Sequence, residues 1–98
     1  MDYKWFESEI RPNHSIYLRH DKDRLTFNMM TDPASKGGSG CQFTDLIETA
    51  LIMVKYLNEK FPCRENAITI TKLEESLMWQ EKRTTDRISR EVEGKDEK

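Results

Sequence analysis

The sequence contains few of the residues from which metal centres and disulfide frameworks are built. Its 98 residues include two cysteines and two histidines. Cys41 and Cys63 lack the C-x-x-C spacing of a zinc site, and neither has a neighbouring histidine that would complete one. We therefore expect both cysteines to be free thiols, and we expect neither a metal site nor a cofactor.

Long apolar runs and an excess of basic charge are also missing. No apolar stretch reaches the roughly 18 residues of a membrane-spanning helix, and the amino-terminal residues lack the pattern of a signal peptide. Without such segments, we expect a soluble intracellular protein that does not bind membranes. The 16 basic and 18 acidic residues leave a formal net charge of -2. Because binding to nucleic-acid polymers depends on a basic surface, we do not expect it to bind such polymers either.

The common catalytic arrangements are absent as well. His14 and His20 have no serine, cysteine or carboxylate at a spacing typical of a triad. Glu74 and Glu75 are adjacent, so on a helix their side chains diverge by about 100° and cannot act as a catalytic pair. The sequence therefore predicts a protein that is not an enzyme.

The sequence does contain two strongly patterned helical stretches. The second, residues 66–87, is unbroken by glycine or proline. Because only residues 61–64 connect the two stretches, the helices should form an antiparallel hairpin, with Ile70, Leu73 and Leu77 facing the first helix. In the first stretch, residues 43–61, apolar residues recur at spacings of three and four and predict a core stripe: Phe43, Leu46, Ile47, Ala50, Leu51, Val54 and Leu57.

The amino-terminal third favours β-strands. Residues 3–10 are rich in aromatic residues without a clear period, so a short strand or a helical turn would fit, and we favour the strand. Pro12 ends this segment. Two alternating runs then flank the charged segment 21–24, which predicts a hairpin with a four-residue loop. The apolar face of this sheet would carry Ile16, Leu18, Leu25, Phe27 and Met29. A sheet this small needs a helix against that face.

These patterns predict a single α+β domain over residues 1–98. A small amino-terminal antiparallel sheet (1–31) would pack on a carboxy-terminal two-helix hairpin (43–90). The glycine-rich segment 32–42 would be a flexible loop between them, and the polar tail 91–98 would be frayed.

One arc of the second helix carries the polar groups of greatest functional interest. The planar donor groups of Arg83 and Arg87 suit a small anionic ligand, and the alternative is a helix with a solvated polar face. On the first helix, Tyr56 lies away from the apolar stripe, so its ring either stacks on a nucleobase or packs at the periphery. At 100° per residue, an arc of about 100° holds Asn66, Thr69, Leu73, Ser76, Gln80, Arg83, Thr84 and Arg87.

The run from Phe61 to Gly94, FPCRENAITITKLEESLMWQEKRTTDRISREVEG, resembles the carboxy-terminal helical-hairpin domain that phage Thoeris anti-defence and anti-CBASS proteins share. The similarity lies in the elements C-R-E-N, T-K-L-E-E, M-W and K-R-T-x-D-R. It implies a phage protein in the cytoplasm of the infected host. Such proteins are sponges that sequester cyclic nucleotide immune signals without cleaving them, and so block Thoeris or CBASS immunity. The strand region favours the Thoeris branch, which implies glycocyclic ADP-ribose, with cyclic di- or trinucleotides as the alternative.

The resemblance also implies which residues hold the ligand between subunits. An aromatic residue late in the first helix corresponds to Tyr56, an asparagine that begins the second to Asn66, and an arginine near its end to Arg83. The family further uses an amino-terminal arginine, for which Arg11 and Arg19 are both candidates. A homodimer or a higher symmetric assembly, such as a hexamer, is therefore expected.

A helical-hairpin module that binds other proteins is the competing interpretation. Met78 and Trp79 lie on a different side of the second helix from Leu73 and would serve such a surface.

Overall fold

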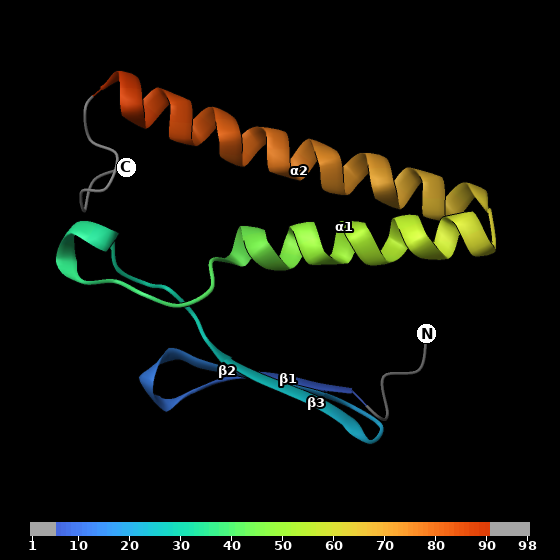
Figure 1. Ribbon diagram of the computed structural model, residues 1–98, viewed down its shortest axis with the longest axis horizontal. Coiled ribbons are helices and arrows are strands. Elements are labelled where there is room, and N and C mark those ends of the chain that lie inside the picture. Colours follow the sequence, from blue (N-terminus) through green and yellow to red (C-terminus); the bar gives the residue numbers. More distant parts are fainter. Residues whose placement is uncertain (1–5, 91–98) are drawn as a thin grey trace. The chain divides into compact units, whose positions relative to one another are not determined.

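The computed structural model describes residues 6–90 and confirms the α+β class. A three-stranded antiparallel sheet precedes a two-helix hairpin (Figure 1). The chain divides into two compact units, one ending at Gln42 and the other beginning at Phe43. Residues 1–5 and the tail 91–98, which was predicted to be frayed, lie outside the described residues.

The sheet unit has the strand order β1-β2-β3, with β1 at Phe6–Arg11, β2 at Ser15–His20 and β3 at Asp23–Asn28. In the antiparallel register, Ile16 stands opposite Phe27, and Leu18 opposite Leu25. Directly opposed residues share a face, so the predicted apolar face of the strands is confirmed. Ile10, which pairs with Ile16, extends this face onto β1.

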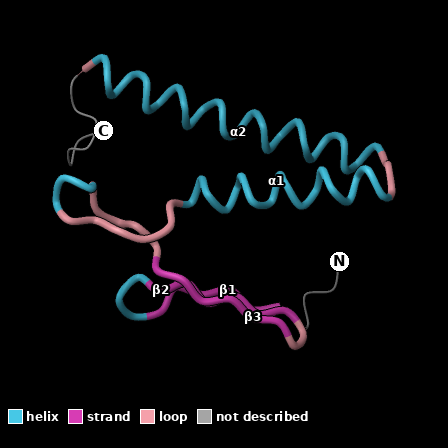
Figure 2. The backbone as a smooth tube through the Cα atoms, viewed as in Figure 1, coloured by secondary structure: helices cyan, strands magenta, loops and turns pink. Residues whose placement is uncertain are grey.

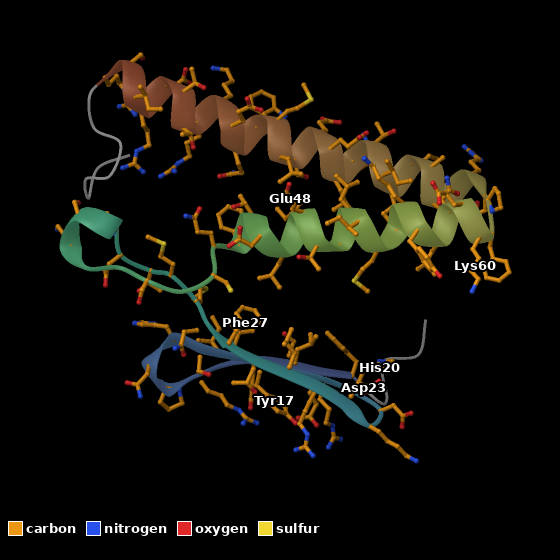
Figure 3. The ribbon with its side chains drawn as sticks, viewed as in Figure 1. Tyr17, His20, Asp23, Phe27, Glu48 and Lys60 are labelled. Carbon is orange, nitrogen blue, oxygen red and sulfur yellow. The ribbon has the colours of Figure 1, made fainter. Side chains whose placement is uncertain are left out.

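Over the described strands, the opposite face of the sheet is polar around one aromatic ring, that of Tyr17. Figure 3 shows Tyr17 and Phe27 projecting from opposite sides of the strands. Tyr17 is buried although its neighbours on this face are charged or polar. The guanidinium carbon of Arg11 lies 3.8 Å from the centre of the Tyr17 ring and covers it.

The connection between β2 and β3 is shorter than predicted. Asp23 and Arg24 belong to β3 and pair with His20 and Arg19, so the turn consists of Asp21 and Lys22 alone. Asp21 takes a φ of 55°, a left-handed conformation that aspartate tolerates better than most residues. The prediction of a four-residue loop was therefore wrong, because charge does not prevent residues from joining a strand ladder.

The segment between the sheet and the hairpin folds back on the end of β3. It contains a short 3-10 helix, η2 (Ala34–Lys36), and Met29 and Cys41 form an isolated parallel bridge. The amide of Cys41 donates to the carbonyl of Asn28 over 2.9 Å. A second short 3-10 helix, η1 (Pro12–His14), connects β1 to β2, at the proline that was predicted to end the first segment.

The hairpin unit consists of α1 (Phe43–Lys60) and α2 (Arg64–Ser89), which run antiparallel (Figure 2). Apart from Arg87 near the end of α2, the least exposed residues on each helix recur at alternating spacings of three and four, the pattern of a narrow coiled-coil seam. The centre of this seam is apolar and both of its ends are polar. The seam holds Thr44, Ile47, Leu51, Val54 and Asn58 from α1, and Asn66, Ile70, Leu73, Leu77 and Gln80 from α2.

The seam is narrower than the stripe predicted for α1. Ile47, Leu51 and Val54 belong to it, whereas Phe43 and Leu57 are about half exposed, at 55% and 47%. A single neighbouring helix covers only a strip of a partner helix, so a wider apolar stripe leaves part of its surface uncovered.

Candidate functional site

The loop end of the hairpin carries Tyr56 on α1. Its side chain is 62% exposed, and Lys60 Nζ lies 5.9 Å from the centre of its ring. At 100° per residue, Tyr56 lies about 140° around α1 from Leu51, which is buried in the seam. The ring therefore projects from the side of α1 that faces away from α2.

Asn66, in the first turn of α2, is fixed by a relay of hydrogen bonds at the same end. Its backbone N–H donates to Cys63 Sγ over 3.4 Å, so Cys63 caps the helix. The backbone N–H of Cys63 in turn donates to Asn58 Oδ1 over 3.2 Å. Asn66 is half-buried in the seam. The relay holds the start of α2 against the end of α1.

The far end of α2 presents Arg83 and buries Arg87. Arg83 is exposed, whereas Arg87 is only 7% exposed and is the buried charged residue of the described chain. Because α2 has 26 residues and α1 has 18, the last turns of α2 extend past the start of α1 (Figure 1). Arg83 lies in this overhang.

The predicted polar arc of α2 is not one open surface. Asn66 and Gln80 lie in the seam, while Thr69 and Ser76 are exposed. The hydroxyl groups of Thr69 and Ser76 donate to backbone carbonyls four residues earlier, over 2.8 and 2.9 Å, rather than pointing outward as ligand donors. Arg83 is thus the charged donor that this arc exposes.

The structure does not bring the predicted ligand residues together within one chain. Asn66 and Arg83 are 17 positions apart on α2, which corresponds to about 25 Å along the helix axis. Tyr56 projects away from the helix on which both of them lie. One small ligand cannot contact all three residues of a single chain.

Both candidate arginines of the amino-terminal region lie on the polar face of the sheet. Arg11 Nε is 2.6 Å from Glu9 Oε1, and Arg19 pairs with Glu7 across strands at 3.2 Å. Sequence reasoning missed Arg24, which stands directly opposite Arg19 in the ladder. Arg19 thus lies between a like charge on β3 and the carboxylate of Glu7 on β1, which offsets part of the repulsion.

Two of the features at the loop end were also missed, although the sequence held a signal for one of them. Lys60 follows Tyr56 by four positions, the spacing that places two side chains on the same face of a helix. Cys63 gave no signal, because cysteine is not among the residues that usually cap helices.

Metal and membrane sites are not found in the part of the chain that the structure describes. Over residues 6–90, no three histidine, cysteine, aspartate or glutamate side chains gather closely enough to hold a metal ion. Neither α1 nor α2 combines the length and the apolar character that crossing a bilayer requires.

The two-helix hairpin, which carries the candidate ligand-binding residues, is similar to a known domain. Residues 40–85 match the family described as the Acb2/Tad1 hairpin domain, and the chain belongs to that family. The matched range includes Tyr56, Asn66 and Arg83 and ends before Arg87.

A curated relative extends this similarity beyond the hairpin. Over 75 residues the chain is 47% identical to a protein named Thoeris anti-defense 1, from Bacillus phage SBSphiJ7. The alignment covers 74% of this chain and 53% of the relative, so the chain spans about half the length of that protein.

Proposed function

We propose that this protein is a phage anti-defence sponge, which binds a cyclic nucleotide immune signal without cleaving it in the cytoplasm of the infected host. The name of the curated relative and the hairpin family support the anti-defence role. Glycocyclic ADP-ribose is the proposed ligand, and cyclic di- or trinucleotides are the alternative within the same class.

We further propose that the ligand is held between two copies of the chain. The observation that carries this proposal is the distance of about 25 Å between Asn66 and Arg83 on one helix. If two hairpins pack antiparallel to each other, the loop end of one copy meets the overhang of the other. A two-fold axis then creates two equivalent sites, each with Tyr56 and Asn66 from one chain and Arg83 from the other.

The chemistry of these residues suits a nucleotide. Tyr56 stacks on an adenine ring, Asn66 reads a base edge or a ribose hydroxyl, and Arg83 binds a pyrophosphate through two parallel hydrogen bonds. Either Arg11 or Arg19 from the sheet supplies a further cation.

Affinity also favours a site that two copies share. A sponge must bind its signal at about nanomolar concentration, near -12 kcal/mol. A charge-assisted hydrogen bond contributes about 1.5 to 3 kcal/mol, a stacked base about 1 to 3, and a neutral hydrogen bond about 0.5 to 1.5. A single chain offers one ligand either the stacked base with the neutral bond or the charge-assisted bond, so its contacts fall far short once the cost of immobilising the ligand is included. Two copies that close on the ligand provide more donors and exclude water.

The test is to incubate purified protein with glycocyclic ADP-ribose, cyclic dinucleotides and cyclic trinucleotides, and then to heat it and identify what is released. We expect one of these molecules to bind in calorimetry and to be recovered unchanged. Recovery of a hydrolysed product would instead identify an enzyme, and the absence of any binding would reject the sponge function.

A protein-binding module is the second candidate, because Met78 and Trp79 are both largely exposed on α2. A module of this kind would ignore every cyclic nucleotide in the same calorimetric series. The two functions are therefore separated by one experiment.

A further inference from the structure

Lys60 differs from the other lysines of the described hairpin. Lys55 pairs with Glu74 at 3.5 Å, Lys72 with Glu75 at 3.7 Å, and Lys82 with Asp86 at 3.0 Å. Lys60 instead places its ammonium group beside the Tyr56 ring. Within residues 6–90, no carboxylate is found at ion-pair distance from Lys60 Nζ.

The contact between Lys60 and Tyr56 leaves the ammonium group available to a ligand. Its distance of 5.9 Å from the ring centre is at the outer limit of a cation–π interaction, about 6 Å. Both residues are exposed and lie one turn apart on the same side of α1, at the loop end that Figure 3 marks with Lys60. An exposed aromatic ring thus has a positive charge over it.

We propose that Lys60 is a further ligand-binding residue, whose ammonium group binds a phosphate of the nucleotide that stacks on Tyr56. This inference rests on the proposed sponge function. In a nucleotide the phosphate lies one ribose away from the base, so a surface that binds both needs an aromatic ring with a cation nearby. Lysine acts as a flexible point charge toward phosphate, which suits a position beside a stacked base.

The position of Arg83 explains why a second cation is required. Within one chain Arg83 lies at the opposite end of α2 from the loop. In the shared site it approaches from the other copy and binds one side of a pyrophosphate. Lys60 supplies charge to the other side from the same chain as Tyr56, so the two phosphates are neutralised from both directions.

The test measures the affinity of Lys60→Gln for glycocyclic ADP-ribose and for a cyclic dinucleotide, on whichever of the two the parent binds. We expect a loss of about tenfold, which corresponds to one charge-assisted hydrogen bond. Lys72→Gln is the matched control, because it removes the same charge from the same hairpin, and we expect it to bind like the parent. Lys60→Arg should restore most of the affinity.

The salt dependence provides a readout that a merely structural role would not change. Added salt screens an ammonium–phosphate contact, so the affinity of Lys60→Gln should fall less steeply with salt than that of the parent. An unchanged affinity of Lys60→Gln, or an equal loss of affinity in Lys72→Gln, would overturn the inference about Lys60. The sponge function would still stand, because the parent binds the ligand. If the parent binds neither probe nor any cyclic trinucleotide, both proposals are rejected.

Discussion

Arg83 and Arg87 lie one turn apart on α2, yet their surroundings differ. Arg83 is exposed in the overhang, whereas Arg87 is buried. A buried guanidinium group has already lost its hydration to interact with the groups around it. Its removal would therefore destabilise the fold itself. Arg83 is thus the arginine whose substitution separates a ligand-binding role from a structural one.

We expect Arg83→Ala to lose about 2 to 5 kcal/mol of ligand affinity, or roughly 30-fold to several-thousand-fold, because a bidentate contact with phosphate disappears. Arg83→Lys should recover little, since an ammonium group cannot reproduce the planar pair of donors. Asn66→Ala should cost less, about 0.5 to 1.5 kcal/mol, as it removes a neutral hydrogen bond. Calorimetry with the identified ligand measures all three.

The melting temperature of the unliganded protein is the control for this series. Arg83→Ala should change the free energy of unfolding by less than about 0.5 kcal/mol, because an exposed residue outside the seam makes few contacts. A large drop in melting temperature without ligand would mean that Arg83 is structural, and an unchanged affinity would remove it from the site.

At the scale of elements, the segment after β3 depends on two glycines, Gly38 and Gly40, for its close backbone packing. A β-carbon on Gly38 would stand 1.8 Å from the carbonyl oxygen of Asp32, which is backbone and cannot rotate away. We expect Gly38→Ala to destabilise the sheet unit by about 1 to 3 kcal/mol. Faster hydrogen exchange of the β3 amides should report the change, whereas Ser39→Ala should leave their exchange as it is in the parent.

Much of the fold could be predicted from the sequence because β2, β3 and both helices each carry their own period. The alternation of Ile16, Leu18, Leu25 and Phe27 determined one face of the sheet, and spacings of three and four determined both helices. The length of the β2–β3 turn could not be predicted, since it depends on whether Asp21 adopts a positive φ. A hydrophobic pattern contains no information about that backbone angle.

The width of the hairpin seam and the composition of the site were harder to predict, for a related reason. Periodicity places a residue on a face, but the neighbours decide how much of that face is covered. Phe43 and Leu57 were therefore expected in the core and are exposed. Likewise the positions of Tyr56, Asn66 and Arg83 along the chain were visible in the sequence, whereas their separation in space appears only in the folded hairpin.

At the scale of the whole molecule, the shared site makes a prediction about mixtures. Tyr56→Ala and Arg83→Ala should each have lost the tight binding of the parent when alone. Mixed and allowed to exchange subunits, they should form heterodimers in which one of the two sites combines an intact Tyr56 with an intact Arg83. With random pairing about a quarter of all sites is restored, and calorimetric stoichiometry measures this fraction.

A site contained within one chain predicts no recovery at all in the mixture, so that outcome would contradict the shared site. Sedimentation of the parent with ligand provides the independent check, because the proposal requires a species of at least twice the 11.6 kDa of one chain. A monomer in the presence of bound ligand would be incompatible with it.

The composition of the hairpin seam has a consequence for its local opening. Apolar residues occupy only its middle, at Leu51 and Leu73 and one turn to either side, while polar residues such as Asn58 and Gln80 close the two ends. Amide hydrogens should therefore exchange slowest at the centre and progressively faster toward both ends. The candidate ligand residues lie in those fast-exchanging ends. A bound ligand should slow exchange at both ends of the hairpin and leave its centre unchanged. The difference in exchange rate between the centre and the ends should therefore become smaller on binding.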